Sequence, residues 1–104
     1  MSWKNYKQLN VWWRAMDLTD EIYKLIEQLP KTELFALSSQ LRRAAVSVPS
    51  NIAEGNGRFS EKEFKQFLSV AKGSVYEVET QLLICIRRGY IKKEDAAIAL
   101  DLCD

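Results

Sequence analysis

The chain has 104 residues and a mass of 12.0 kDa, which is enough for a single domain over residues 1–104 and too little for two. Its 47% hydrophobic and 28% charged residues are typical of a globular protein rather than a disordered chain. Fifteen basic and fourteen acidic residues leave a net charge of +1, which argues against a strongly cationic protein that coats nucleic acid. The absence of histidine excludes a His-based catalytic triad and His-ligated metal sites.

Cysteine usage indicates a reducing compartment, and the lack of long apolar runs argues against a membrane span. Cys85 and Cys103 have neither CxxC nor zinc-ligand spacing, so we interpret them as structural thiols in a reducing cytoplasm. The N-terminal segment lacks the apolar core of a signal peptide. The longest uncharged run, residues 44–53, is too short for a membrane span, which needs about twenty residues. We expect a cytoplasmic protein without a membrane partner.

The first two predicted helices follow from apolar residues spaced three or four apart. Residues 9–29 carry such a stripe, and Pro30 is expected to end this helix. The second helix is expected to begin near Thr32, which has an N-capping side chain and is followed by Glu33 in the first turn. Its stripe comprises Leu34, Leu37, Leu41, Ala44, Ala45, Val48 and Ile52.

Pro49 interrupts the second helix. A proline inside a helix removes one backbone donor and costs around 3 kcal/mol, so the helix either kinks and continues to about Glu54 or stops at Val48. The apolar spacing continues to Ile52 across the proline, which favours the kinked helix. The Gly-Asn-Gly run at residues 55–57 is then expected to form the C-cap and turn.

The third helix has the clearest start, because Ser60 and Glu63 form a capping-box pattern. Its apolar stripe runs to Gly89, and the small residues Ala71 and Gly73 are expected where another helix approaches closely. A fourth, short helix is predicted from around residues 92–93 to the terminus. No stretch alternates with a period of two. The predicted class is therefore all-α: an antiparallel up-down-up-down four-helix bundle with a Pro49 kink in the second helix.

Apolar residues also lie outside these stripes, on a second face of the first and third helices. A helix with two apolar faces needs two partners, and in a small bundle the second is often another subunit. This indicates a homo-oligomer. The alternative is a wide core stripe covered by the fourth helix, but that helix is short. The additional residues are Val11, Leu18, Ile22, Leu25, Tyr76, Leu83 and Ile84.

A polar stripe on the second helix matches one on the third. If these stripes face each other, they form a polar layer with pairs such as Arg43 and Glu77, which we interpret as a network that sets helix register or a subunit joint. The functional alternative is a polar pocket. No nucleophile lies at a spacing that pairs it with a base, so we expect no enzyme, catalytic residue, cofactor or metal. The residues of the predicted layer are Gln40, Arg43, Asn51, Glu54, Glu77 and Gln81.

Basic residues off the apolar stripes are the candidate nucleic-acid contacts. Phosphate neutralisation needs clustered cations and not a high net charge, so one face of a near-neutral protein can bind RNA. The alternative is a solvated helix face with interspersed carboxylates. The candidates are Arg42, Arg58, Lys62, Lys65, Lys72, Arg87 and Arg88.

Three stretches of the sequence are distinctive: residues 9–12 (LNVW), residues 41–55 (LRRAAVSVPSNIAEG), and residues 71–74 (AKGS) followed by Glu77 and Gln81. In these stretches the chain resembles the family of 23S rRNA-intervening-sequence proteins. The resemblance implies a homopentameric barrel of four-helix bundles whose second helix continues through the proline. The family is similar to accessory variability proteins of diversity-generating retroelements, which implies RNA or a reverse transcriptase as partners. The fourth helix here ends earlier than is usual in the family.

We therefore expect a non-enzymatic, oligomeric, all-α protein that associates with RNA. The competing interpretation is a protein-interaction scaffold with no nucleic-acid role.

Overall fold

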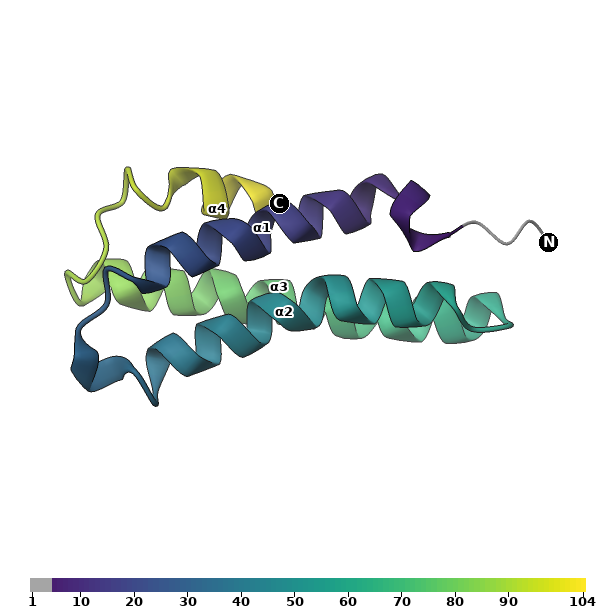
Figure 1. The fold of residues 1–104 in the computed structure, drawn as a ribbon, viewed down its shortest axis with the longest axis horizontal. Helices are drawn as coiled ribbons and strands as arrows, with labels where there is room; N and C mark the ends of the chain where they lie inside the picture. The colour runs from purple at the N-terminus through teal and green to yellow at the C-terminus, as the bar shows by residue number, and fades with distance from the viewer. Residues whose placement is uncertain (1–4) are drawn as a thin grey trace.

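The computed structural model describes residues 5–104, and every regular element in that range is helical, which confirms the predicted all-α class. Residues 1–4, which begin the N-terminal segment without a signal-peptide core, lie outside the described residues. In chain order the elements are η1 (Tyr6–Gln8), α1 (Asn10–Ile26), η2 (Lys31–Glu33), α2 (Leu37–Asn56), α3 (Glu61–Arg87) and α4 (Ala97–Leu102) (Figure 1).

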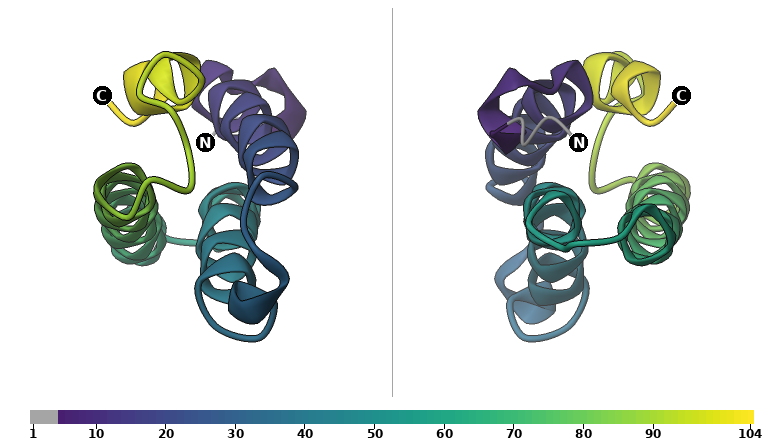
Figure 2. Two further views of the ribbon diagram at one scale, coloured as in Figure 1. Left: turned by 90° about the vertical axis from the view of Figure 1, so that its left-hand side faces the viewer. Right: turned by 90° about the vertical axis from the view of Figure 1, so that its right-hand side faces the viewer.

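The helices alternate in direction and form an elongated bundle of 48 × 23 × 17 Å. Viewed end-on, they lie at the corners of a square, with α2 packed against both α1 and α3 and α4 packed against α1 (Figure 2). The fourth corner is only partly filled, because α4 has 6 residues whereas α3 has 27. The fourth helix therefore covers one end of the bundle and leaves the other end open on that side (Figure 1).

The buried core consists of two clusters, one that includes residues of α4 and one at the end of the bundle that α4 does not cover. A larger cluster of buried side chains includes Leu18, Leu41 and Leu82 and extends to Ala96 and Ala99 at the start of α4. Leu18, Ile22 and Leu25 belong to this core, so their prediction as part of a second apolar face of the first helix was wrong. A smaller cluster lies toward the other end of the bundle and joins the three long helices without α4. Its buried members are Ala15, Val48, Ile52 and Ala71.

Several helix boundaries differ from the prediction. Helix α1 ends at Ile26 instead of residue 29, and Thr32 lies in η2 and caps no α-helix. The start of α2 is shifted to Leu37, where the Glu33 carboxylate accepts a hydrogen bond from the Leu37 amide at 3.4 Å. The Tyr90 hydroxyl donates to the same carboxylate at 3.1 Å, so a contact distant in sequence selects this start.

The fourth helix also begins later than predicted. Residues 92–96 form turns, and the helix starts at Ala97. The chain enters this segment through Gly89, whose positive φ of 77° ends α3 as expected. Ile91 and Ala96 are buried, so these apolar anchors hold the segment against the bundle in place of a helical turn.

Helix α2 runs through Pro49 to Asn56, which agrees with the continuous helix favoured by the apolar spacing. Gly57 is the C-cap, and its amide donates to the carbonyl groups of Ala53 and Glu54. The predicted cap is therefore at residue 57, while Gly55 belongs to the helix. The N-cap of α3 at Ser60 is confirmed, because its hydroxyl oxygen accepts from the Glu63 amide at 3.1 Å. The Glu63 carboxylate accepts from the Ser60 hydroxyl at 3.2 Å, where a full capping box would have it accept from the Ser60 backbone amide.

The closest approach of α2 to α3 occurs at Gly55. A Cβ atom added there would lie 2.6 Å from the Phe67 Cβ and 3.0 Å from a ring carbon of Phe64. A Cβ added at Gly73 would meet nothing within 4 Å. Ala71 is buried as predicted, but Gly73 faces solvent, so the prediction that Gly73 marks a helix contact was wrong.

We expect Gly55→Ala to destabilise the fold and Gly73→Ala to stabilise it. The methyl group at residue 55 forces the α2–α3 contact apart, which costs about 1–3 kcal/mol, whereas alanine at residue 73 adds about 0.5–1 kcal/mol of helix propensity. Urea denaturation of the two variants measures both changes. Equal effects of the two substitutions would contradict the assigned contact.

Candidate functional site

The polar stripes of α2 and α3 meet in the structure. The hydroxyl oxygens of Ser47 and Ser74 are 2.9 Å apart and share a hydrogen bond across the two helices. The Asn51 Nδ2 donates to the Ser47 carbonyl oxygen at 2.8 Å and to its hydroxyl at 2.9 Å. These hydrogen bonds form one polar network between α2 and α3 and fix the position of one helix along the other.

The network has a second, less complete part at Gln40 and Gln81. The Gln81 Nε2 donates to the Gln40 Oε1 at 3.5 Å, which is the long limit for such a bond. Gln81 is only 9% exposed. Within residues 5–104, its Oε1 is the buried side-chain oxygen that finds no hydrogen-bond partner. Leaving a buried acceptor unpaired costs about 1–3 kcal/mol, so this end of the layer is the weaker one.

Arg43 and Glu77 line one open cleft of about 400 Å³ between α2 and α3, together with Gln40, Ser47 and Ser74. In the part of the chain that the structure describes, these two charges form no ion pair within 4.0 Å. Both side chains belong to exposed residues, which solvent hydrates.

Glu54, the remaining member of the predicted layer, turns toward Arg58 instead. The closest charged atoms of this pair are 3.6 Å apart, and both side chains are largely exposed. Such a pair contributes at most about 1 kcal/mol. The structure thus connects Gln40 with Gln81 and Asn51 with the serine pair, and it places Glu54 outside that network.

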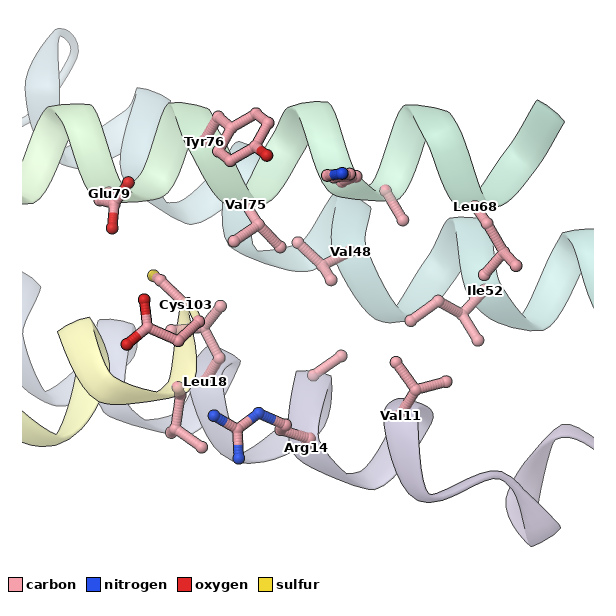
Figure 3. Close-up of a pocket in the computed structure, with 15 residues that line it drawn as sticks. Val11, Arg14, Leu18, Val48, Ile52, Leu68, Val75, Tyr76, Glu79 and Cys103 are labelled. Carbon is pink, nitrogen blue, oxygen red and sulfur yellow. The ribbon is translucent and has the colours of Figure 1, made fainter. Parts of the chain in front are cut away.

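An apolar groove of about 420 Å³ lies where α4 ends (Figure 3). Figure 3 shows Val11 and Leu18 of α1 opposite Val48 and Ile52 of α2, with Leu68 and Val75 of α3 completing the wall. The end of the groove next to α4 is formed by residues 102–104. The groove was not predicted from the sequence, because its walls come from three separate helices.

Charged side chains border the groove. Arg14 of α1 and Lys72 of α3 lie on opposite banks, and Glu79 and Asp104 also line it. The Arg14 guanidinium donates to the Asp101 carbonyl oxygen at 2.9 Å, which fastens the end of α4 to α1.

Both cysteines are held as neutral thiols. Burial, together with smaller contributions from the carboxylates of Glu79 and Asp104, raises the pKa of Cys103 to about 11. Burial likewise raises the pKa of Cys85 to about 11, with a smaller contribution from Glu33. The nucleophilic form of a cysteine is the thiolate, so neither side chain is an activated nucleophile.

We expect both thiols of the folded protein to react with iodoacetamide at about pH 8 at least about a hundredfold more slowly than free cysteine. The rate should rise about tenfold per pH unit until about pH 11, because only the thiolate reacts. Mass spectrometry of the alkylated protein measures this rate. The urea-unfolded chain is the control, and equal rates for folded and unfolded protein would contradict the raised pKa values.

Four of the predicted cationic contacts share the outward face of α3. Lys62, Lys65, Lys72 and Arg87 are all exposed and fall within one quadrant of the helix at 100° per residue. The exposed residues between them on the same face are uncharged: Ser69, Tyr76, Thr80 and Leu83. We call these eight residues the basic stripe. The Lys72 ammonium lies 5.9 Å from the centre of the Tyr76 ring.

The other three predicted cations lie elsewhere. Arg42 is half-buried on α2, and Arg58 follows that helix, 4.8 Å from the centre of the Phe67 ring. Arg88 is the C-cap of α3 and lies 6.0 Å from the Tyr90 ring centre. The structure therefore divides the seven candidates into one continuous stripe of four and three dispersed cations.

Among residues 5–104, no three or more Cys, Asp or Glu side chains converge as metal ligands would. No helix in the same range combines the length and the apolar character needed to cross a membrane.

Comparison with known proteins places the chain in a family. No curated protein matches it. The family model described as "23S rRNA-intervening sequence protein" matches residues 7–104, which is nearly the whole chain. The three stretches that resemble this family all lie within the matched range, on α1, α2 and α3. The chain belongs to the 23S rRNA-intervening sequence protein family.

Proposed function

We propose that this protein is a non-enzymatic, oligomeric helical bundle that associates with RNA through the basic stripe of α3. The stripe is the observation that carries the proposal. Its four cations extend over residues 62–87, about 38 Å of helix at 1.5 Å per residue. No carboxylate lies between them within that quadrant, which Glu61 and Glu79 flank on one side, although the net charge of the whole chain is only +1.

The chemistry of the stripe matches what an RNA strand presents. Lysine and arginine neutralise phosphates, and hydroxyl groups such as those of Ser69 and Thr80 donate to phosphate or sugar oxygens. The exposed ring of Tyr76 offers a surface on which an unpaired base can stack. In an oligomer, each copy adds one more stripe to the binding surface.

Exposed apolar side chains support oligomerisation. Within residues 5–104, twelve large apolar side chains are at least 39% exposed, including Trp13, Tyr23 and Val46 on α1 and α2. Large apolar surfaces on a small protein usually mark an interface. The resemblance to the family implies a ring of five copies, and the two isolated cysteines favour a cytoplasmic location.

The non-enzymatic assignment has chemical support. The chain has no histidine, and the pKa values of both thiols are near 11. A competing proposal keeps the oligomer and replaces RNA by a protein partner such as a reverse transcriptase. The exposed apolar side chains fit a protein partner equally well. The four cations that share one face of α3 favour RNA.

We expect light scattering after size exclusion to give a mass several times 12.0 kDa at micromolar protein concentration, and five times that mass for a closed pentamer. The physical reason is burial of the exposed apolar side chains between copies. A monomer that persists across the concentration range would contradict the oligomer.

We expect Lys62→Glu combined with Lys65→Glu to weaken binding of a labelled structured RNA at least about tenfold at low salt and to reduce the salt dependence of the affinity. Both residues lie in the first turns of α3, where glutamate is favourable, so the fold should persist. Fluorescence anisotropy at two salt concentrations measures both effects.

The matched control is Lys92→Glu combined with Lys93→Glu, which reverses the same charge outside α3. This control should weaken binding far less than the stripe variant. If the unmodified protein fails to bind RNA even at low salt, the protein-interaction scaffold replaces the RNA proposal.

A further inference from the structure

An open surface lies between α2 and α3, on the side of the bundle that faces away from α1 and α4 (Figure 2). It is the cleft of about 400 Å³ that Arg43 and Glu77 line. Every residue of its lining belongs to α2 or α3, so the shape of the cleft does not depend on the length of α4.

Arg43 and Glu77 lie at the same level on opposite banks of this cleft. Helices α2 and α3 run in opposite directions, and the hydrogen bond between Ser47 and Ser74 sets their register. Arg43 lies four residues before Ser47 and Glu77 lies three residues after Ser74, so the two exposed charges are neighbours across the cleft. Within residues 5–104 they form no ion pair, which leaves each charge available to a partner.

We propose that this cleft is the contact surface for a second copy of the chain, which packs face to face around a two-fold axis that runs along the cleft. A rotation of 180° about this axis places α2 of the second copy over α3, and α3 of the second copy over α2. Each level of the cleft then faces the same level of the other copy. Arg43 of each copy therefore lies opposite Glu77 of the other, and two ion pairs form. This contact goes beyond the proposed ring, because a two-fold contact joins copies in pairs and cannot close a ring of five.

The charges of the cleft select a second copy as the occupant. One cation and one carboxylate at the same level give phosphates no net attraction, so this surface is unsuited to RNA. The same two charges become complementary to themselves after a rotation of 180°, which is what an interface between identical surfaces requires. The basic stripe lies on another quadrant of α3 and stays exposed in the pair.

The glutamine pair gives a second indication of a missing partner. Gln81 is 9% exposed, and its Oε1 finds no hydrogen-bond donor within residues 5–104. Its neighbour Gln40 lines the cleft. In the two-fold arrangement Gln40 of the second copy lies opposite Gln81, where its amide can donate to this oxygen after a rotation of the Gln81 amide group.

Gly73 is a third feature that the single chain does not explain. It lies in the middle of α3, where glycine destabilises a helix relative to alanine. A Cβ added there meets nothing within 4 Å, so the glycine contacts no helix of its own chain. At 100° per residue it shares a face of α3 with Glu77. The missing side chain lets α2 of a second copy approach α3, as Gly55 does inside the chain.

Exposed apolar side chains extend the contact on both sides of the charged level. Val70 and Ile84 each lie seven residues from Glu77, which is two turns of helix, and they share its face. They are 53% and 41% exposed. Ile84 lines the adjoining cleft with Ala36 and Leu37, and in the two-fold arrangement it meets these residues of the second copy. Pairing therefore removes apolar surface from water at both ends of the contact.

The size of this face sets the expected strength of pairing. Helix α2 has 20 residues and is about 30 Å long, and two adjacent helices are about 20 Å wide. Such a face covers about 600 Å² per copy, near the lower limit of specific interfaces. We therefore expect reversible pairing with a dissociation constant on the order of 10–100 μM.

Charge reversal tests the two ion pairs. Arg43→Glu places four carboxylates around the axis, and Glu77→Arg places four guanidinium groups there, so each variant alone should pair at least about tenfold more weakly. An equimolar mixture of the two variants should regain the pairing, because every contact then joins a guanidinium to a carboxylate. Sedimentation equilibrium of the full chain between about 1 μM and about 1 mM measures the pairing, and circular dichroism checks that the variants remain folded.

Matched controls separate the contact from general effects of charge and bulk. Lys92→Glu and Glu94→Arg reverse the same charges outside the cleft and should leave pairing unchanged, alone or mixed. Gly73→Leu should weaken pairing at least about tenfold without unfolding the chain, because leucine favours a helix and residue 73 is exposed. Ala97→Leu adds bulk at an exposed residue of α4 and should have no effect on pairing.

Three outcomes would overturn the proposal. One is an average mass of the unmodified chain that fails to rise about twofold across the concentration range. The others are pairing that neither charge variant weakens, and weakening that the mixture of the two variants does not reverse. The proposed ring is judged separately by the mass at micromolar concentration, and the RNA proposal by anisotropy, so each can stand when this contact fails.

Discussion

The packing of α2 against α3 is the contact on which the other features depend. Gly55 lets the two backbones approach, because any side chain there would collide with Phe67. Farther along the same pair of helices, the hydrogen bond between Ser47 and Ser74 connects polar groups that must otherwise be hydrated. The apolar contacts supply most of the stabilisation, and the hydroxyl pair adds a directional constraint on how the helices slide. Helix α1 packs onto this pair through α2, and α4 packs onto α1.

The short fourth helix divides the molecule into two physically different halves. Under α4, the core is closed on all four sides and includes fully buried residues such as Ile22 and Leu82. Beyond Leu102 the same three helices present apolar side chains to the groove. Cys103 lies at this boundary, and the low polarity there explains its raised pKa.

For helix α3, the sequence predicted the ends of the helix and the individual cations, but not how the cations group on its surface. Its N-cap at Ser60, its end at Gly89 and its apolar spacing gave correct boundaries, because these signals act within a few residues. The sequence also identified the cations, but their grouping required a face that no other helix covers. Lys72 and Arg87 fall on that face, whereas Arg58 turns to Glu54 after the end of α2. Local spacing could not decide which cations remain unpaired.

The sequence by itself determined the helical class, the continuation of α2 through Pro49 and the polar stripe on each of α2 and α3, because helix periodicity and capping are local properties. Tertiary structure decided the start of α2, where the Glu33 carboxylate is held by Tyr90 from the other end of the chain. It also decided which glycine the helix packing requires. Side chains of α3 lie against Gly55, whereas no atom would lie within 4 Å of a Cβ added at Gly73. Tertiary structure also decided the groove, because its walls come from three helices that are distant in sequence.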